Sequence, residues 1–159
     1  MKYYSYYEFP IGTLGIGEDG VGISHIFLPG TADVSAAVQK ETPLIAAAAA
    51  QLREYFSGAR KVFDLPLSPD GTAFQRRVWE KLCEIPYGEC RSYGDLAGSI
   101  GNPKACRAVG MANHRNPILI VIPCHRVLGK DGSLTGYAAG MKMKQALLDL
   151  EGIRYKERN

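Results

Sequence analysis

Residues 92–113 read SYGDLAGSIGNPKACRAVGMAN, and this stretch predicts two short helices joined by a tight turn. Ser92 is a favoured N-cap residue, so we expect a helix over 93–99, which a Gly-Asn pair then breaks. Pro103 is tolerated in the first turn of a helix, and this places the second helix over 104–113. Two such helices with glycine in the turn have the dimensions of a helix-turn-helix, although plain helix–helix packing would produce the same pattern.

Outward from this stretch, the second half of the chain is predicted to be mostly helical. Thr72 can cap a helix whose apolar residues recur at helical spacing as far as Leu82. A last helix is expected over 141–151. Its apolar face would carry Met143, Ala146, Leu147 and Leu150. Residues 118–122 are apolar and lie between prolines, so we expect them to be buried and extended.

The first half predicts a small sheet and a helix. Residues 1–31 combine aromatic and β-branched runs with the strong turn signal Asp19-Gly20, as expected for an antiparallel meander. A helix should open at Pro43 and end at Ser57-Gly58, and 62–67 could add a short strand.

A stretch rich in proline and glycine near residue 70 predicts two domains, 1–70 and 71–159. The chain of 159 residues, with 46% hydrophobic and 22% charged residues, has the composition of a globular protein. The first domain carries 5 Lys and Arg against 8 Asp and Glu, and the second carries 14 against 8. The basic domain could meet a polyanion, although a solvated surface is the simpler explanation of the charge alone.

The sequence predicts neither a membrane protein nor a metal site. No apolar run is long enough to span a bilayer, and the opening MKYYSYYEFPIGT lacks the apolar region of a signal peptide. The cysteines at 83, 90, 106 and 124 form no C-x-x-C pair, and the histidines form no H-x₃₋₅-H pair. Free thiols in such a chain indicate a reducing cytosol.

Cys124 is the candidate nucleophile, because Pro123-Cys124-His125-Arg126 sets its thiol beside a histidine and an arginine. The thiolate is the nucleophilic form, and cationic or basic neighbours favour it. A buried inert cysteine is the alternative, and it is our interpretation of the other three cysteines. The four residues alone leave both readings of Cys124 open.

PCHRV at 123–127, together with Asn116-Pro117 and RAVG at 107–110, resembles the O6-alkylguanine-DNA alkyltransferases. The likeness is dense over 72–152 and looser over 1–70. It implies an α+β fold: a small ribonuclease H-like α/β supporting domain, then a mostly helical domain with a winged-helix-like helix-turn-helix. It also implies that O6-alkylguanine flips out of duplex DNA and that its alkyl group moves irreversibly to the protein's own cysteine, without a cofactor.

The resemblance also implies roles for five residues. Cys124 would be the acceptor, His125 would take its proton through a water, and Glu151 would orient and charge that histidine. Asn116 would hold the turn before the active-site segment, and Tyr137 would donate a proton toward the base. We therefore expect Cys124 at the floor of a cavity shaped for a purine, with its thiolate favoured by His125.

Further matches concern DNA binding. Arg107 would fill the gap left by the flipped base, and Tyr93 would press on the target phosphate, with the second helix in the minor groove. Four other positions match residues near the DNA backbone: Gln75, Gly94, Asn102 and Lys130. Ala138 and Ala139 would line the pocket rim; Ala139 replaces a common glycine, a change that would slow transfer of bulky groups such as benzyl relative to methyl.

Two other functions compete with alkyl transfer: a non-catalytic protein that binds alkylated DNA, and a turnover thiol hydrolase with a Cys–His pair. The expected partner is double-stranded DNA that contains O6-alkylguanine, with activity on O4-methylthymine left open. We expect a monomer in the cytoplasm, associated with the nucleoid in a bacterium, or in the nucleus of a eukaryote.

Overall fold

The computed structural model describes residues 1–157 and divides into two compact units. The first unit comprises Met1–Asp70 and Pro117–Leu119, and the second comprises Gly71–Asn116 and the chain from Ile120 onward. Within residues 1–157 no helix is both long and apolar enough to cross a bilayer. In the same part of the chain, no three His, Cys, Asp or Glu residues gather as a metal site would need.

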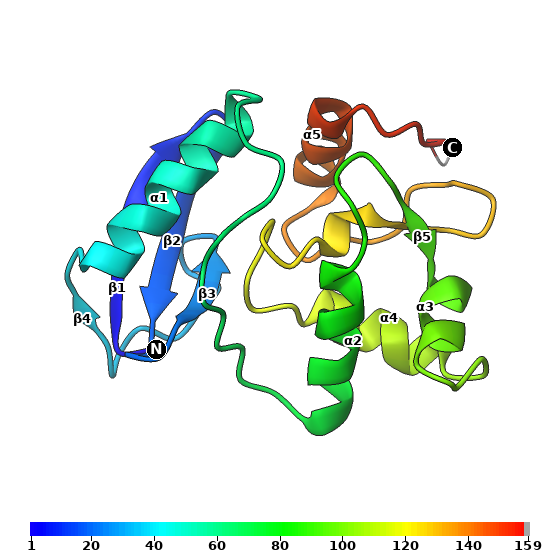
Figure 1. The fold of residues 1–159 in the computed structure, drawn as a ribbon, viewed down its shortest axis with the longest axis horizontal. Coiled ribbons are helices and arrows are strands. Elements are labelled where there is room, and N and C mark those ends of the chain that lie inside the picture. Colours follow the sequence, from blue (N-terminus) through cyan, green and yellow to red (C-terminus); the bar gives the residue numbers. More distant parts are fainter. Residues whose placement is uncertain (158–159) are drawn as a thin grey trace. The chain divides into compact units, whose positions relative to one another are not determined.

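The first unit is a four-stranded sheet in the order β3-β2-β1-β4, with one helix against it (Figure 1). Its elements are β1 (Tyr3–Phe9), β2 (Gly12–Glu18), β3 (Ile23–Phe27), β4 (Val38–Gln39) and α1 (Pro43–Phe56). The first three strands form the predicted antiparallel meander, and β4 adds a parallel edge to β1. The helix opens at Pro43, where Thr42 accepts a hydrogen bond from the Ile45 N–H.

The predicted strand over 62–67 is wrong, since only Leu67 makes an isolated bridge, to Ile23. The backbone of Asp64 is bound by a side chain instead: Gln51 of α1 donates to its carbonyl and accepts from its N–H, both at 2.9 Å. Pro66 also lacks an N–H to give to a sheet.

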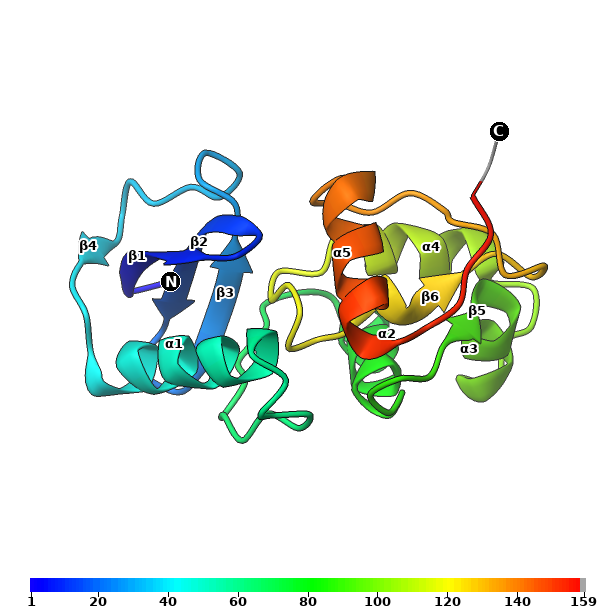
Figure 2. The ribbon, with the colours of Figure 1, turned by 90° about the horizontal axis from the view of Figure 1, so that it is seen from above.

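The second unit surrounds a short parallel strand pair with helices (Figure 2). Its elements are α2 (Ala73–Cys83), β5 (Arg91–Ser92), α3 (Tyr93–Ser99), α4 (Cys106–His114), η1 (Cys124–Arg126), β6 (Val127–Leu128) and α5 (Met141–Glu151). Thr72 and Ser92 form capping boxes at α2 and α3, which explains why both helix starts could be predicted. Helices α3 and α4 pack together as the helix-turn-helix pattern requires.

The second helix of that pair begins at Cys106, two residues later than predicted. The N–H of Ala105 bonds to the carbonyl of Asn102 at 3.0 Å, so Pro103 and Lys104 belong to a turn. The N-cap residue Ala105 has no side chain that can cap the helix, so no local side-chain signal marks where the helix begins.

Residues 118–122 are largely buried, as expected, but they are not extended. Ile118 bridges to Ile26, and the chain then turns through 119–121. Ile120 has φ of +72°, which is uncommon for a β-branched residue. The carbonyl of Pro117 and the N–H of Leu119 bond to the backbone of Ile26 in β3. The chain bends directly after this pairing, before it reaches Cys124.

The buried face of α5 also differs from the prediction. It comprises Met143, Lys144, Leu147, Leu148 and Glu151, whereas Ala146 and Leu150 are only half-buried. The apolar pattern misplaced this face because two of its members are charged residues with buried partners.

Candidate active site

Cys124, His125 and Arg126 form one turn of 3₁₀ helix, η1, which α2 and α5 contact. A strand would alternate their side chains between two faces, but this turn buries all three. Only 1% of Cys124 and none of His125 is exposed.

Asparagines hold the turn from the α4 side. The Asn116 side-chain N–H group donates to the Cys124 Sγ at 3.0 Å and to the Ile122 carbonyl at 2.8 Å. Asn113, on α4, donates to the Cys124 carbonyl at 3.4 Å. Asn116 thus bonds both to the Cys124 sulfur and to the backbone two residues before it, and this restricts the orientation of the Cys124 side chain.

Burial sets the protonation state of the pair. Loss of water raises the pKa of the Cys124 thiol to about 11, although hydrogen bonds from Asn116 and Tyr137 and the charge of Lys144 lower it. Burial also lowers the pKa of His125. At neutral pH the thiol is therefore protonated and the imidazole neutral, so the expectation that His125 keeps the thiolate in the resting protein is wrong.

We expect iodoacetamide to label Cys124 more slowly than the exposed Cys106 at pH 7. The labelling rate of Cys124 should rise about tenfold per pH unit toward pH 10, because only the thiolate reacts. Mass analysis of the two cysteine peptides measures both rates, and in urea the two should converge. Faster labelling of Cys124 in the native protein would contradict a thiol that is buried and protonated.

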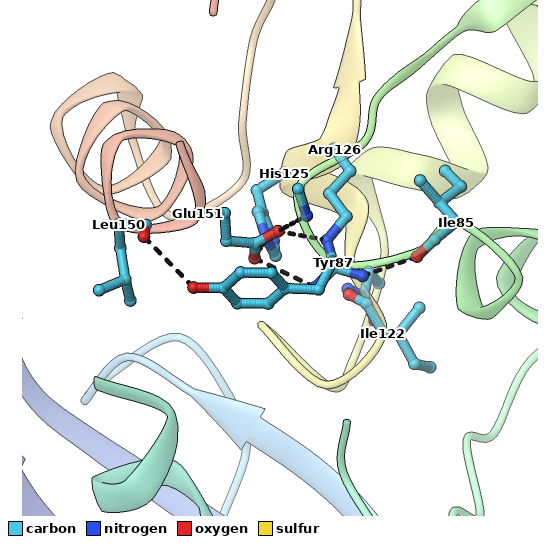
Figure 3. A network of polar contacts seen from close by, with 9 residues as sticks. Ile85, Tyr87, Ile122, His125, Arg126, Leu150 and Glu151 are labelled. Atoms are coloured by element: carbon cyan, nitrogen blue, oxygen red, sulfur yellow. Dashed lines mark hydrogen bonds and ion pairs between the residues drawn. The ribbon is translucent and has the colours of Figure 1, made fainter. Parts of the chain in front are cut away.

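Glu151, at the end of α5, is the centre of a buried polar network (Figure 3). Its Oε2 lies 2.6 Å from His125 Nε2 and 3.1 Å from Arg126 Nη2. Its Oε1 accepts from Arg126 Nε at 2.7 Å and from the Gly88 N–H at 3.2 Å. Arg126 also donates to the Ile85 carbonyl at 2.7 Å, so its charge is paired and each of its three side-chain nitrogens makes a hydrogen bond.

The network determines which nitrogen of His125 can act as a base. A carboxylate only accepts hydrogen bonds, so the His125 Nε2 that faces Glu151 carries the proton. Nδ1 then holds the lone pair, and it is buried without a hydrogen-bond partner among residues 1–157. Nδ1 is therefore the nitrogen of His125 that is able to accept a proton.

Sequence reasoning missed a second buried group, Lys144 of α5. Its Nζ donates to the Val127 carbonyl at 2.6 Å, to the Thr135 carbonyl at 3.3 Å and to the Thr135 hydroxyl at 3.1 Å. The Tyr93 hydroxyl lies 2.8 Å from the same Thr135 oxygen. Lys144 lies three and four residues before Leu147 and Leu148, which places it on the apolar face of α5. A lysine on that face is the signal in the sequence that could have indicated a buried charge.

The residues expected to bind DNA lie mostly at the surface of the second unit. Arg107 is exposed in the first turn of α4. Exposed as well are Gly94, Asn102 and Lys130. Gln75 is half-buried and bonds to the backbone of Thr72 in its capping box.

Two cavities of about 690 and 510 Å³ open in this unit. Tyr93, Gly94 and Lys130 line the larger one, but Cys124 lines neither. Cys124 is 1% exposed, and the buried Tyr137 hydrogen-bonds to its thiol, so the purine-shaped cavity expected above Cys124 stays a prediction.

Comparison with protein families places the chain. The 6-O-methylguanine DNA methyltransferase DNA-binding domain matches residues 73–153, and the ribonuclease-like domain of the same proteins matches residues 2–69. The chain belongs to the 6-O-methylguanine DNA methyltransferase family. The resemblance inferred from PCHRV and its companion motifs is confirmed, and so is the α+β fold class.

Members of the 6-O-methylguanine DNA methyltransferase family are similar over nearly the whole chain. The constitutive methylated-DNA–protein-cysteine methyltransferase of Bacillus subtilis is 51% identical and covers 99% of this chain and 100% of its own. The methylated-DNA–protein-cysteine methyltransferase of Haemophilus influenzae is 46% identical, over 96% of this chain and 88% of its own. The crystal structure of Mycobacterium tuberculosis OGT in complex with DNA has a TM-score of 0.88 at 44% identity, over 94% and 92%.

Proposed function

We propose that this chain repairs DNA by transferring the alkyl group of O6-alkylguanine to its own Cys124, once per molecule. Relatives that match end to end are methylated-DNA–protein-cysteine methyltransferases, and the similar Mycobacterium tuberculosis OGT was solved with DNA. The observation that carries the proposal is the Cys124 sulfur, gripped by Asn116 at 3.0 Å beside the buried His125–Glu151 pair. No other thiol of the chain has such surroundings among the described residues.

The reaction begins with removal of the thiol proton. His125 Nδ1 takes it through a water, and the imidazolium that forms is stabilised by Glu151 at 2.6 Å. Asn116, Tyr137 and the charge of Lys144 all favour the thiolate of Cys124 at this stage. These contacts offset part of the cost that burial imposes on the thiolate.

The thiolate then displaces guanine from the alkyl carbon. An S–C bond forms as the C–O6 bond breaks, and the electron pair of that bond passes to the base. Tyr137 donates a proton toward the base, so that guanine leaves uncharged. The product is a thioether, which no group of this site can cleave, and one molecule therefore repairs one lesion.

The surface of the second unit binds the DNA. Arg107 enters the duplex from α4 in the minor groove and replaces the flipped base, while Tyr93 presses on its phosphate. Gln75, Gly94, Asn102 and Lys130 contact the backbone. Residues 71–159 are the DNA-binding and acceptor domain, which their excess of Lys and Arg supports, and the acidic residues 1–70 form a supporting domain.

The base reaches Cys124 only if the loop around Tyr137 moves, because the thiol is 1% exposed. Ala138 and Ala139 then form the rim of the pocket that opens. The smaller the alkyl group, the less this loop must move, which favours methyl over benzyl.

The proposal is tested by the mass of the protein after mixing with an equimolar O6-methylguanine duplex. We expect one methyl group on the peptide that contains Cys124, and no second turnover with excess DNA. An unmethylated duplex is the control. Tight binding without a gain in mass would support a non-catalytic lesion-binding protein, and repeated turnover of an ester would support a hydrolase.

We propose that the protein is located in the compartment that holds the DNA, which is the cytoplasm and nucleoid of a bacterium or the nucleus of a eukaryote. One protein molecule with one acceptor sulfur needs no second copy, and we propose a monomer. Gel filtration of the free protein and fractionation of the host cell test these two statements.

A further inference from the structure

Thr135 stands between two polar side chains from separate helices, Tyr93 at the start of α3 and Lys144 in α5. Its hydroxyl oxygen lies 2.8 Å from the Tyr93 hydroxyl and 3.1 Å from Lys144 Nζ. Lys144 is fully buried, whereas Tyr93 and Thr135 are half-buried. The loop residue therefore joins a buried charge to a side chain that lines the larger cavity.

The chemistry of the three groups fixes the direction of one of these two hydrogen bonds and allows two directions for the other. An ammonium group has donors only, so Lys144 donates to the Thr135 oxygen. The Thr135 oxygen has two lone pairs, so Tyr93 can either donate to it or accept the Thr135 proton. In the second arrangement the proton of Tyr93 remains for another acceptor.

The same groups feel the charge of the acceptor sulfur. The Cys124 thiolate would raise the pKa of Lys144, which burial lowers to about 8, and it contributes to the raised pKa of Tyr93 after burial. Asn113 and Thr135 face the Tyr93 hydroxyl and lower its pKa, while His125 is a further ionisable group affected by the Lys144 charge. The Thr135 bridge thus lies within the electrostatic reach of Cys124.

We infer that Thr135 is a positioning residue for alkyl transfer: its hydroxyl accepts from Lys144, donates to Tyr93 and so leaves the Tyr93 proton for an acceptor on the DNA substrate. This inference rests on the proposed function. Thr135 itself touches no reacting atom and acts through Tyr93. Without the Thr135 hydroxyl, Tyr93 loses the partner that orients its own hydroxyl.

A double-mutant cycle tests whether Thr135 acts through Tyr93. Thr135→Val removes the hydroxyl and keeps the shape, and it should slow single-turnover transfer at saturating O6-methylguanine DNA by about 10-fold, the effect of one well-placed hydrogen bond. On a Tyr93→Phe background the same change should have almost no effect. Thr135→Ser, which keeps the hydroxyl, should restore most of the rate.

Controls separate this role from a structural one. Thr31→Val, at an exposed turn of the first unit, should transfer at the original rate. If Thr135→Val does not fold by circular dichroism, Thr135→Ala carries the same cycle. Equal slowing with and without the Tyr93 hydroxyl, or no rescue by serine, would overturn the inference. An original protein that transfers no methyl group would instead overturn the proposed function.

Discussion

Replacement of Cys124 by serine is expected to reduce methyl transfer by at least about 1,000-fold. A serine hydroxyl has a far higher pKa than a thiol, and its oxygen is the poorer nucleophile toward an alkyl carbon. Affinity for DNA should remain, because Arg107 and the exposed surface of α4 are untouched. Transfer of radiolabelled methyl from duplex to protein measures the first effect, and a gel-shift titration measures the second.

Cys83→Ser, at the end of α2, is the matched control and should keep the original transfer rate. A Cys124→Ser protein that accepts methyl at the original rate would place the acceptor at another residue. Loss of both transfer and DNA binding would point to misfolding, which urea denaturation detects.

Glu151→Gln is expected to lower the free energy of unfolding by about 3 kcal/mol or more. The carboxylate is the counter-charge of Arg126, whose side chain is only 7% exposed, and an amide would leave that guanidinium buried without an anion. Transfer should slow as well, because in the proposed reaction a neutral amide stabilises the His125 imidazolium less than a carboxylate does. Urea denaturation and the single-turnover rate measure the two losses.

The control for this change is Glu89→Gln, at an exposed ion pair with Arg91 of 3.3 Å, where the loss should be below about 1 kcal/mol. Adding Arg126→Met to Glu151→Gln should recover part of the stability, because it removes the unpaired charge. If Glu151→Gln cost no more than the Glu89 control, the buried pair would not be the stabilising feature described above.

The shared carboxylate also explains how one site keeps a neutral base next to a protonated thiol. Glu151 alone would raise the pKa of His125, but burial and the neighbouring Arg126 both lower it. The imidazole of His125 is therefore uncharged at neutral pH, and its Nδ1 has no hydrogen-bond partner among residues 1–157. In the proposed reaction the imidazole becomes charged only when it takes the proton of Cys124, and Glu151 is in contact to stabilise it.

Sequence patterns could predict the elements of the fold whose signals are local. Thr72 and Ser92 mark helix starts, because a cap contacts a residue only three positions away. The meander of residues 1–31 and the helix at Pro43 follow from equally short-range rules. The family too could be identified from the sequence, since PCHRV and its companion motifs lie in one order along the chain.

Only the tertiary structure decided the state of the site. The protonated thiol of Cys124, the Glu151 carboxylate shared between a base and a cation, and the buried Lys144 depend on groups that lie far apart in the sequence. The bend at Ile120 and the buried face of α5 have the same origin. Burial and charge are set by whatever packs against a residue in space, and no short stretch of sequence contains that information.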